Sequence, residues 1–227
     1  MSYIFGYITA DGCICKRKDR QNSYTLNITS KDKEHLFKIK KDLCPNHPIS
    51  MKYNSQKISY FQIQICNREI CRDLMNLGIL PRKTANLNHI EVPDKYFPDF
   101  VRGFFDGDGT IYTYKVNGTP QIKAGFVSAS LNFLEKFNNQ LCKVINIPPK
   151  NIHKTFSRHK NIPQYSICFY IDDCRKLADF MYGKNPSLYL PRKREVFEKW
   201  KLINRRHYIK QNYPSKIGWR LNEKSFV

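Results

Sequence analysis

Two short segments, far apart in the chain, follow one pattern. Residues 4–12 read IFGYITADG, and residues 101–109 read VRGFFDGDG. Each is a largely apolar run with two small residues four positions apart, so the small residues share one face of a helix. Side chains of that size let two helix backbones approach closely. The pattern therefore predicts two helices that pack against each other along their small residues.

Each segment closes with an aspartate, Asp11 in the first and Asp108 in the second. A carboxylate is poorly placed at the C-terminal end of a helix, where the helix dipole is already negative. Two such carboxylates side by side need a cation, and oxygen ligands favour a hard divalent ion. The plainer interpretation is a pair of buried helices that end in exposed Asp-Gly turns. The recurrence of the segment within a longer repeat argues against it.

The repeat extends well beyond these two segments. In each half, the periodicity of apolar residues predicts helix, two strands, helix, two strands, helix. Leu80–Lys83 recurs letter for letter as Leu190–Lys193. This order predicts an α+β chain, with a further helix over 195–205. Its expected divisions are an N-terminal half-domain at 1–84, a connector at 85–98, a C-terminal half-domain at 99–204 and a basic tail at 205–227.

Composition points to a polyanionic partner. The 227 residues include 39 Lys and Arg against 19 Asp and Glu, a net charge of +20 that favours nucleic acid. No apolar run reaches the length of a membrane span, so no membrane partner is expected. The eight cysteines lack zinc-ribbon spacing, and no secretion signal is evident. We therefore expect reduced thiols in an intracellular compartment, either cytoplasm with nucleoid or an organelle matrix, and not secretion.

Both segments resemble the signature helix of the LAGLIDADG homing endonucleases. The second, FVRGFFDGDGTI, is the closer match, and the first departs from it at Thr9. Two copies imply the monomeric form, with two pseudo-symmetric αββαββα half-domains and the signature helices packed at the centre. Each four-stranded antiparallel sheet would form one side of a saddle over DNA. The resemblance implies a site-specific endonuclease that hydrolyses both strands of a long, asymmetric double-stranded DNA target and leaves short 3′ overhangs.

The resemblance also implies a metal site. Asp11 and Asp108 match the metal-binding aspartates of the family, and the backbone carbonyls of Ala10 and Gly107 match its further ligands. Mg²⁺ is the expected cofactor, with Mn²⁺ as a substitute and Ca²⁺ supporting DNA binding without cleavage. A divalent ion can supply an activated water, orientation and charge stabilisation in phosphodiester hydrolysis. Asp106 is a poorer ligand, because it lies two residues before Asp108 and should point elsewhere.

Lys83 and Lys193 are the expected catalytic lysines. Each ends a copy of the repeated Leu-Pro-Arg-Lys segment, and the family places an active-site lysine near this point. Arg82 and Arg192 are the substitutes if the alignment slips by one residue. The other interpretation is that both lysines are solvated residues at helix starts.

The polar faces of the strands are the expected DNA-reading surface, because Arg, Asn and Gln can make bidentate contacts to purine edges. In the first half the candidates are Arg17, Thr25, Asn27, Gln62 and Gln64. In the second they are Tyr112, Tyr114, Lys123, Gln164 and Ser166, with Arg158 and Lys160 expected in a hairpin turn that contacts phosphates. Ordinary surface polarity remains the alternative for any one of these residues.

Other functions fit parts of the pattern. A non-cleaving protein on the same fold stays open, as an intron maturase that has intron RNA as a partner or as a DNA-binding regulator. The presence of both aspartates favours cleavage. A calcium loop beginning at Asp106 would need glycine at its sixth position and glutamate at its twelfth. The chain has Ile111 and Asn117 there, which excludes that motif.

Overall fold

The computed structural model describes residues 1–16, 23–53, 56–83, 87–156 and 162–212, with side chains as far as Ile203. Its two halves repeat one order of elements, as the sequence predicts. The N-terminal half contains α1 (Ser2–Asp11), β1 (Gly12–Lys16), β2 (Tyr24–Ser30), α2 (Lys33–Leu43), β3 (Ile49–Tyr53), β4 (Ser59–Ile65) and α3 (Arg68–Asn76). The C-terminal half contains α5 (Phe97–Asp108), β5 (Thr110–Val116), β6 (Thr119–Ser128), α6 (Leu131–Val144), β7 (His153–Phe156), β8 (Pro163–Tyr170), α7 (Ile171–Tyr182) and α8 (Pro191–Asn212). A 3₁₀ turn, η1 (Asp94–Tyr96), leads into α5.

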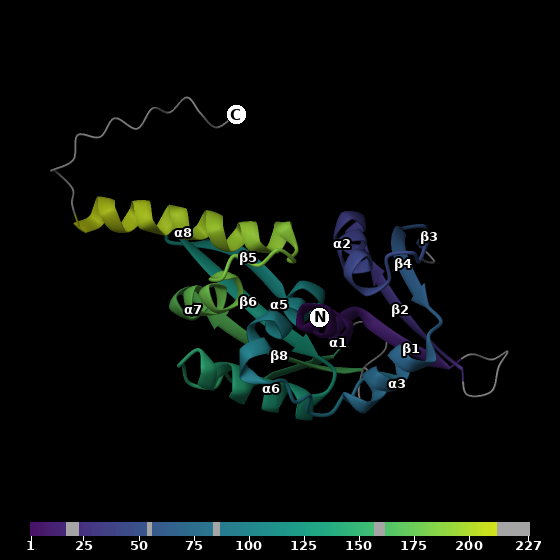
Figure 1. The fold of residues 1–227 in the computed structure, drawn as a ribbon. Helices are drawn as coiled ribbons and strands as arrows, with labels where there is room; N and C mark the ends of the chain where they lie inside the picture. Colours follow the sequence, from purple (N-terminus) through teal and green to yellow (C-terminus); the bar gives the residue numbers. More distant parts are fainter. Residues whose placement is uncertain (17–22, 54–55, 84–86, 157–161, 213–227) are drawn as a thin grey trace.

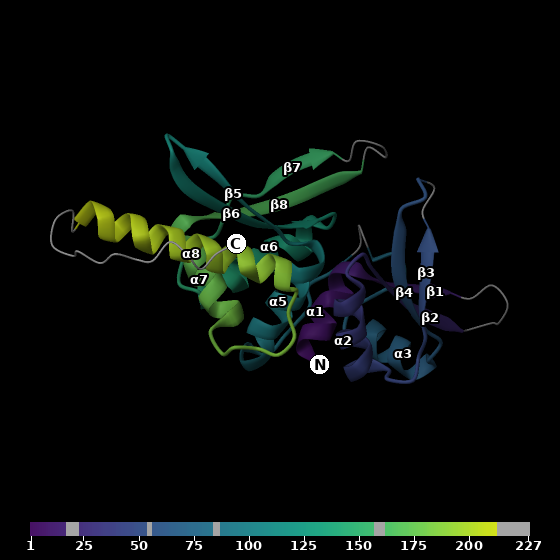
Figure 2. The same cartoon turned by 90° about the horizontal axis from the view of Figure 1, so that it is seen from above.

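Each half has one four-stranded antiparallel sheet. The strand orders are β1-β2-β4-β3 and β5-β6-β8-β7, so the two sheets have equivalent topology. Helices α2 and α3 pack on strands β4 and β2, and α6 and α7 pack on β8 and β6. The sheets lie on either side of the central pair α1 and α5 (Figures 1 and 2). The predicted α+β fold with two four-stranded sheets is therefore confirmed.

The two half-domain cores differ in composition. The N-terminal core is mainly aliphatic, with Leu26, Ile28 and Ile63 fully buried beneath its sheet. The C-terminal core is built on phenylalanines, such as Phe104 and Phe126, whose stacked rings have centroids 5.6 Å apart. Edge-to-face and offset ring pairs of this kind add to the stability that burial provides.

The central helices α1 and α5 touch at glycines, which accounts for the small-residue pattern. A Cβ atom on Gly6 would collide with the carbonyl oxygen of Phe100 in α5. A Cβ atom on Gly103 would collide in the same way with the carbonyl of Tyr3 in α1. The two contacts are pseudo-symmetric, and they fix the two backbones in direct contact. The predicted close packing of the two helices is confirmed.

The last helix is longer than expected. It begins at Pro191, inside the repeated segment, and continues past residue 205 to Asn212. Proline suits the first turn of a helix, because its fixed φ is helical and its missing N–H would be unpaired there. α8 extends outward from the body of the C-terminal half (Figure 1). Within the described residues, no helix has the length and apolar character needed to cross a bilayer.

Candidate active site

Asp11 and Asp108 lie at the C-terminal ends of the two central helices, and these ends meet. The Asp11 carboxylate reaches across to α5, where its Oδ2 lies 3.4 Å from the position that a Cβ on Gly107 would take. That same Cβ would collide with the side chain of Ala10. Larger residues here would force the helix ends apart. The small residues therefore bring the two carboxylates to one place.

The electrostatics of this place disfavour two negative charges. Removal from water is the main cause that raises the pKa of Asp11 to about 6, and the charge of Asp108 raises it further. The Tyr7 hydroxyl and the lysines Lys193 and Lys83 act in the opposite direction. The Asp108 side chain is exposed at the surface, yet the protein packed around it still raises the pKa of its carboxyl by desolvation. A bound cation would relieve both effects.

Lys83 is buried and turned onto the end of α1. Its Nζ donates to the backbone carbonyls of Thr9, at 2.6 Å, and Ala10, at 2.8 Å. A cation at this position complements the negative end of the helix dipole. Burial lowers the pKa of the Lys83 ammonium, while the carboxylates of Asp108 and Asp11 raise it. The interpretation of this lysine as a solvated residue is wrong.

Lys193 is likewise buried, and it donates to the carbonyls at the C-terminal end of α5. Its Nζ donates to the carbonyls of Phe105 at 2.6 Å, Asp106 at 2.9 Å and Gly109 at 2.6 Å, with Gly107 further away at 3.4 Å. Burial lowers its pKa to about 8, against the opposing effect of nearby aspartates. The solvated interpretation is wrong for this lysine too.

The neighbouring arginines do not share the position of the lysines. The Arg192 side chain turns away to an ion pair with Asp32, with Nη2–Oδ2 at 3.0 Å. Arg82 is exposed and has a positive φ of 58°. The geometry therefore favours the lysines over the arginines as the groups beside the carboxylates.

The donor set at the helix ends suits a hard divalent cation. Within the described residues, no cluster of three or more His, Cys, Asp and Glu side chains could hold a metal ion. The oxygens available at the helix ends are the carboxylates of Asp11 and Asp108 and the carbonyls of Ala10 and Gly107. Each carbonyl oxygen has two lone pairs, so its bond to a lysine leaves one free. Carboxylate and carbonyl oxygens are the ligands that Mg²⁺ and Ca²⁺ prefer.

Asp106 has a structural position. Its buried Oδ2 accepts hydrogen bonds from the Tyr3 hydroxyl, at 2.7 Å, and the Leu190 N–H, at 2.8 Å. Burial raises the pKa of this carboxyl to about 6. It points away from the helix ends, as expected from its place on the helix.

The polar strand residues share one face of each sheet, opposite the core. Asn27 pairs with Gln64 and also with Cys13 across the N-terminal sheet. Lys123 pairs with Tyr112 and Tyr170 across the C-terminal sheet. Gln62, Tyr114, Gln164 and Ser166 lie on the same outward faces and are exposed or half-buried. Arg17, Arg158 and Lys160 lie outside the described residues.

The structure does not support the prediction that Thr25 contacts DNA. It lies on the outward face but is only 3% exposed, and its hydroxyl is 3.6 Å from the Cys66 Sγ. Neighbouring side chains cover it, so it is not available to bind DNA. Tyr170, by contrast, is 44% exposed on the outward face of the C-terminal sheet, although it is not among the predicted residues. The alternation that places Ser166 outward also places Tyr170 outward, so the sequence contained the signal.

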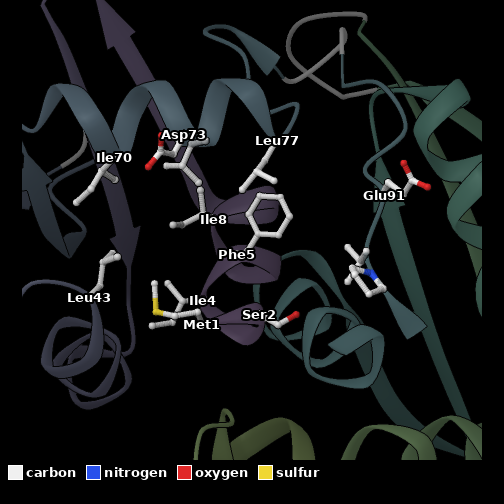
Figure 3. A pocket seen from close by; sticks show the side chains of 13 residues that line it. Met1, Ser2, Ile4, Phe5, Ile8, Leu43, Ile70, Asp73, Leu77 and Glu91 are labelled. Atoms are coloured by element: carbon white, nitrogen blue, oxygen red, sulfur yellow. The ribbon is translucent and has the colours of Figure 1, made fainter. Parts of the chain in front are cut away.

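An apolar cavity of about 430 Å³ lies along one side of α1, from Met1 to Ile8. Figure 3 shows Ile4, Phe5 and Ile8 on α1 facing this space, with the carboxylates of Asp73 and Glu91 at its edges. Acidic groups and apolar walls suit neither phosphate nor a DNA backbone. The helix ends, and not this cavity, are the candidate active site.

Solved LAGLIDADG homing endonucleases are similar to this chain over nearly their whole length. I-GzeII in complex with its DNA target gives a TM-score of 0.58 at 12% sequence identity, with 93% of this chain and 92% of that chain covered. The meganuclease I-AabMI bound to uncleaved DNA gives 0.59 at 15% identity, covering 92% and 91%. I-SmaMI bound to an uncleaved DNA target in the presence of calcium ions gives 0.59 at 14%, covering 93% and 91%. Neither a family model nor a curated protein matches the sequence.

The likeness shows a shared fold at these low identities. The chain has the LAGLIDADG fold, and the resemblance drawn from its two signature segments is confirmed at that level.

Proposed function

We propose that this protein is a site-specific, divalent-metal-dependent DNA endonuclease that cuts both strands of a long, asymmetric duplex as a monomer and leaves short 3′ overhangs. The observation that carries the proposal is the meeting of two carboxylate-bearing helix ends between two sheets with polar outward faces. The net charge of +20 supports a polyanionic partner.

In this proposal Asp11 and Asp108 would hold Mg²⁺, with the carbonyls of Ala10 and Gly107 as further ligands. When bound, such an ion would supply an activated water and charge stabilisation at the attacked phosphate. The desolvated carboxylates bind a cation more tightly when both are ionised. Because the pKa of Asp11 is raised to about 6, protonation competes with metal binding below that pH.

Lys83 and Lys193 position the two sites. Each ammonium draws together the carbonyls at the end of its helix, which fixes the carboxylate that follows. A buried ammonium beside the metal ligands also offers positive charge to the scissile phosphate. Each half then has one aspartate and one lysine for one DNA strand.

The outward sheet faces read the target. Asn27, Gln62 and Gln64 serve the N-terminal half, and Tyr112, Tyr114, Lys123, Gln164 and Ser166 serve the other. Arg17, Arg158 and Lys160 remain predicted contacts. Because the two faces have different side chains, the two half-sites should differ in sequence.

Aspartate substitution tests this function. A cleavable target is first selected by incubating the protein with a randomised duplex library and Mg²⁺ and sequencing the cut ends. Asp11→Asn or Asp108→Asn should then abolish double-strand cleavage while duplex binding, followed by fluorescence anisotropy, survives. Each substitution keeps the side-chain size and removes the charge that holds metal.

Asp172→Asn is the matched control, because Asp172 is 79% exposed on α7. It should cleave like the unmodified protein. Near-normal double-strand cleavage by either active-site variant would contradict the assignment.

A further inference from the structure

Two cysteines stand side by side on the outward face of the N-terminal sheet. Cys13 and Cys15 are both exposed on β1, and their Sγ atoms are 3.5 Å apart. The Asn27 side-chain amide on the neighbouring strand donates to the Cys15 Sγ, also at 3.5 Å.

The separation of the sulfurs does not suit a disulfide. An S–S bond is about 2.05 Å long and needs Cβ atoms about 3.5–4.5 Å apart. Residues two apart in a strand have parallel Cβ directions and a rise of about 3.3 Å per residue, so their Cβ atoms lie further apart. β1 is held in register with β2 from Gly12 to Lys16, which opposes the bend that a disulfide would need.

The separation does suit two thiolates on one soft ion. Two sulfurs at about 2.3 Å from a tetrahedral d¹⁰ cation are roughly 3.8 Å apart. The observed 3.5 Å is close to this value, and the side chains already lean toward each other. A cation could therefore be bound without movement of the strand.

We propose that Cys13 and Cys15 form a binding site for a single soft, thiophilic d¹⁰ cation. Two S–H bonds break, two metal–sulfur bonds form, and two protons pass to solvent. The amide of Asn27 stabilises the charge that develops on the Cys15 sulfur. No third His, Cys, Asp or Glu within the described residues completes the site, so water or an added thiol fills the remaining positions.

This site is chemically distinct from the oxygen site at the helix ends. Thiolates select soft cations, and carboxylates with carbonyls select Mg²⁺ or Ca²⁺. Because Asn27 and Gln64 lie on the same face, a cation with its water shell would stand where the duplex is proposed to dock. Competition between the cation and DNA is therefore expected, and this part rests on the proposed function.

Cadmium titration of the reduced full chain tests the site. Thiolate–cadmium charge-transfer absorption should saturate at one equivalent of Cd²⁺. Cys13→Ser and Cys15→Ser should each weaken the affinity by at least the roughly 10–100-fold that loss of an outer-shell partner costs. Cys66→Ser is the matched control, because Cys66 is exposed on the same face but contacts Thr25. It should bind Cd²⁺ normally.

Phenylarsine oxide provides a second measurement that depends on thiol spacing. It condenses with two neighbouring thiols and releases one water, so one adduct per chain should appear in the native protein by mass spectrometry. No adduct with the unmodified chain, or Cd²⁺ binding that persists in Cys13→Ser and Cys15→Ser, would overturn the proposal.

Duplex binding separates the two proposals. One equivalent of Cd²⁺ should lower duplex affinity for the unmodified protein and not for Cys15→Ser. Stoichiometric Cd²⁺ binding with unchanged duplex affinity would support the thiol site and contradict the proposed DNA-binding face.

Discussion

The four residues Leu80–Lys83 and their repeat Leu190–Lys193 have the same sequence and different structures. In the N-terminal half Leu80 is 41% exposed, and the following Pro81 and Arg82 form a turn. In the C-terminal half Leu190 is 2% exposed, and α8 begins at the proline. Yet both lysines reach the carbonyls at the end of their central helix. The position of the ammonium is common to both halves, whereas the path of the backbone is not.

This difference is accompanied by a different contact from each signature helix. Asp106 accepts a hydrogen bond from the Leu190 N–H and so fixes the start of α8 to α5. Its counterpart in α1 is Thr9, whose hydroxyl donates to Phe5 of its own helix at 2.9 Å. Among the described residues, Thr9 therefore provides no link to Leu80 of the kind that Asp106 provides to Leu190. The two repeated segments thus differ in one buried hydrogen bond to their signature helix.

The outward faces differ in a second way. Across the C-terminal sheet, Tyr112, Lys123 and Tyr170 form a row, with the Lys123 ammonium 5.5 Å from the centre of the Tyr170 ring. Cys15 pairs with Thr25 at the equivalent place in the other sheet. At this place the C-terminal face presents large aromatic groups and the N-terminal face presents small side chains. Equivalent chemistry at the helix ends is thus combined with reading faces that are not equivalent.

The largest expected effect is a loss of stability at the glycine contacts between α1 and α5, which both halves share. Gly6→Ala and Gly103→Ala should each cost about 3 kcal/mol or more of unfolding free energy, because the new methyl group meets a rigid backbone carbonyl. Urea denaturation followed by circular dichroism measures the loss. Asn132→Ala, at an exposed position of α6, is the control.

If those variants do not fold, exchanging Ala10 and Gly107 across the same helix contact provides a second test. Gly107→Ala would place its methyl group against that of Ala10 and should destabilise the protein. The double variant Gly107→Ala with Ala10→Gly should recover much of the loss. Additive losses would show that the helices do not meet at these residues.

The next largest effect concerns the hydrogen bond from the Leu190 N–H to Asp106, which differs between the halves. Asp106→Ala should cost about 2–3 kcal/mol, because it leaves the buried Leu190 N–H unpaired and removes an acceptor from the Tyr3 hydroxyl. Thr9→Ala should cost much less, since its hydroxyl bonds to a carbonyl of its own helix. Urea denaturation of both variants compares them. Equal losses would mean that the Asp106 link does not distinguish the halves.

The reading faces predict effects confined to one half-site. Replacing Gln64 with alanine should relax base preference in one half of the target, and replacing Lys123 should relax it in the other. Each lost bidentate contact should remove about 1–3 kcal/mol of discrimination. Cleavage profiles over all single-base variants of the target measure this, with Lys41→Ala on the exposed surface of α2 as the control. A palindromic preference, or equal loss in both half-sites, would contradict the pseudo-symmetric monomer.

Much of this arrangement follows from local sequence. Strand alternation and helix periodicity predict both sheets, because each element must bury one face. The small residues that let the central helices touch also predict the meeting of Asp11 and Asp108. These features depend on short-range pattern, which the repeat presents twice.

The remaining features depend on contacts between distant residues. The sequence could not show that Lys83 and Lys193 are buried, because a lysine at the start of a helix normally points to solvent. Nor could it show that Thr25 is covered, since this depends on Cys66 some forty residues later. The extension of α8 past residue 205 was not predicted for a different reason, because the sequence there lacks the apolar periodicity that marks a buried helix.

The smallest effect concerns the ion pair between Arg192 and Asp32, which joins the two halves; among the described residues, Arg82 at the repeated position has no equivalent pair. The Arg192 guanidinium donates to both carboxylate oxygens of Asp32 at the start of α2, at 3.2 Å and 3.0 Å. The side chains are 60% and 30% exposed, so water and salt screen the pair. Arg192→Ala should therefore cost at most about 1 kcal/mol of unfolding free energy. Arg82→Ala, at the repeated position, should cost close to nothing.

A double-mutant cycle with Asp32→Ala isolates the pair, because the Asp32 side chain makes no capping hydrogen bond to α2. The coupling should shrink at about 1 M salt, where the screening length falls to about 3 Å. A coupling that persists at high salt, or an equal cost for Arg82→Ala, would show that this pair is not what distinguishes the two repeated segments at the surface.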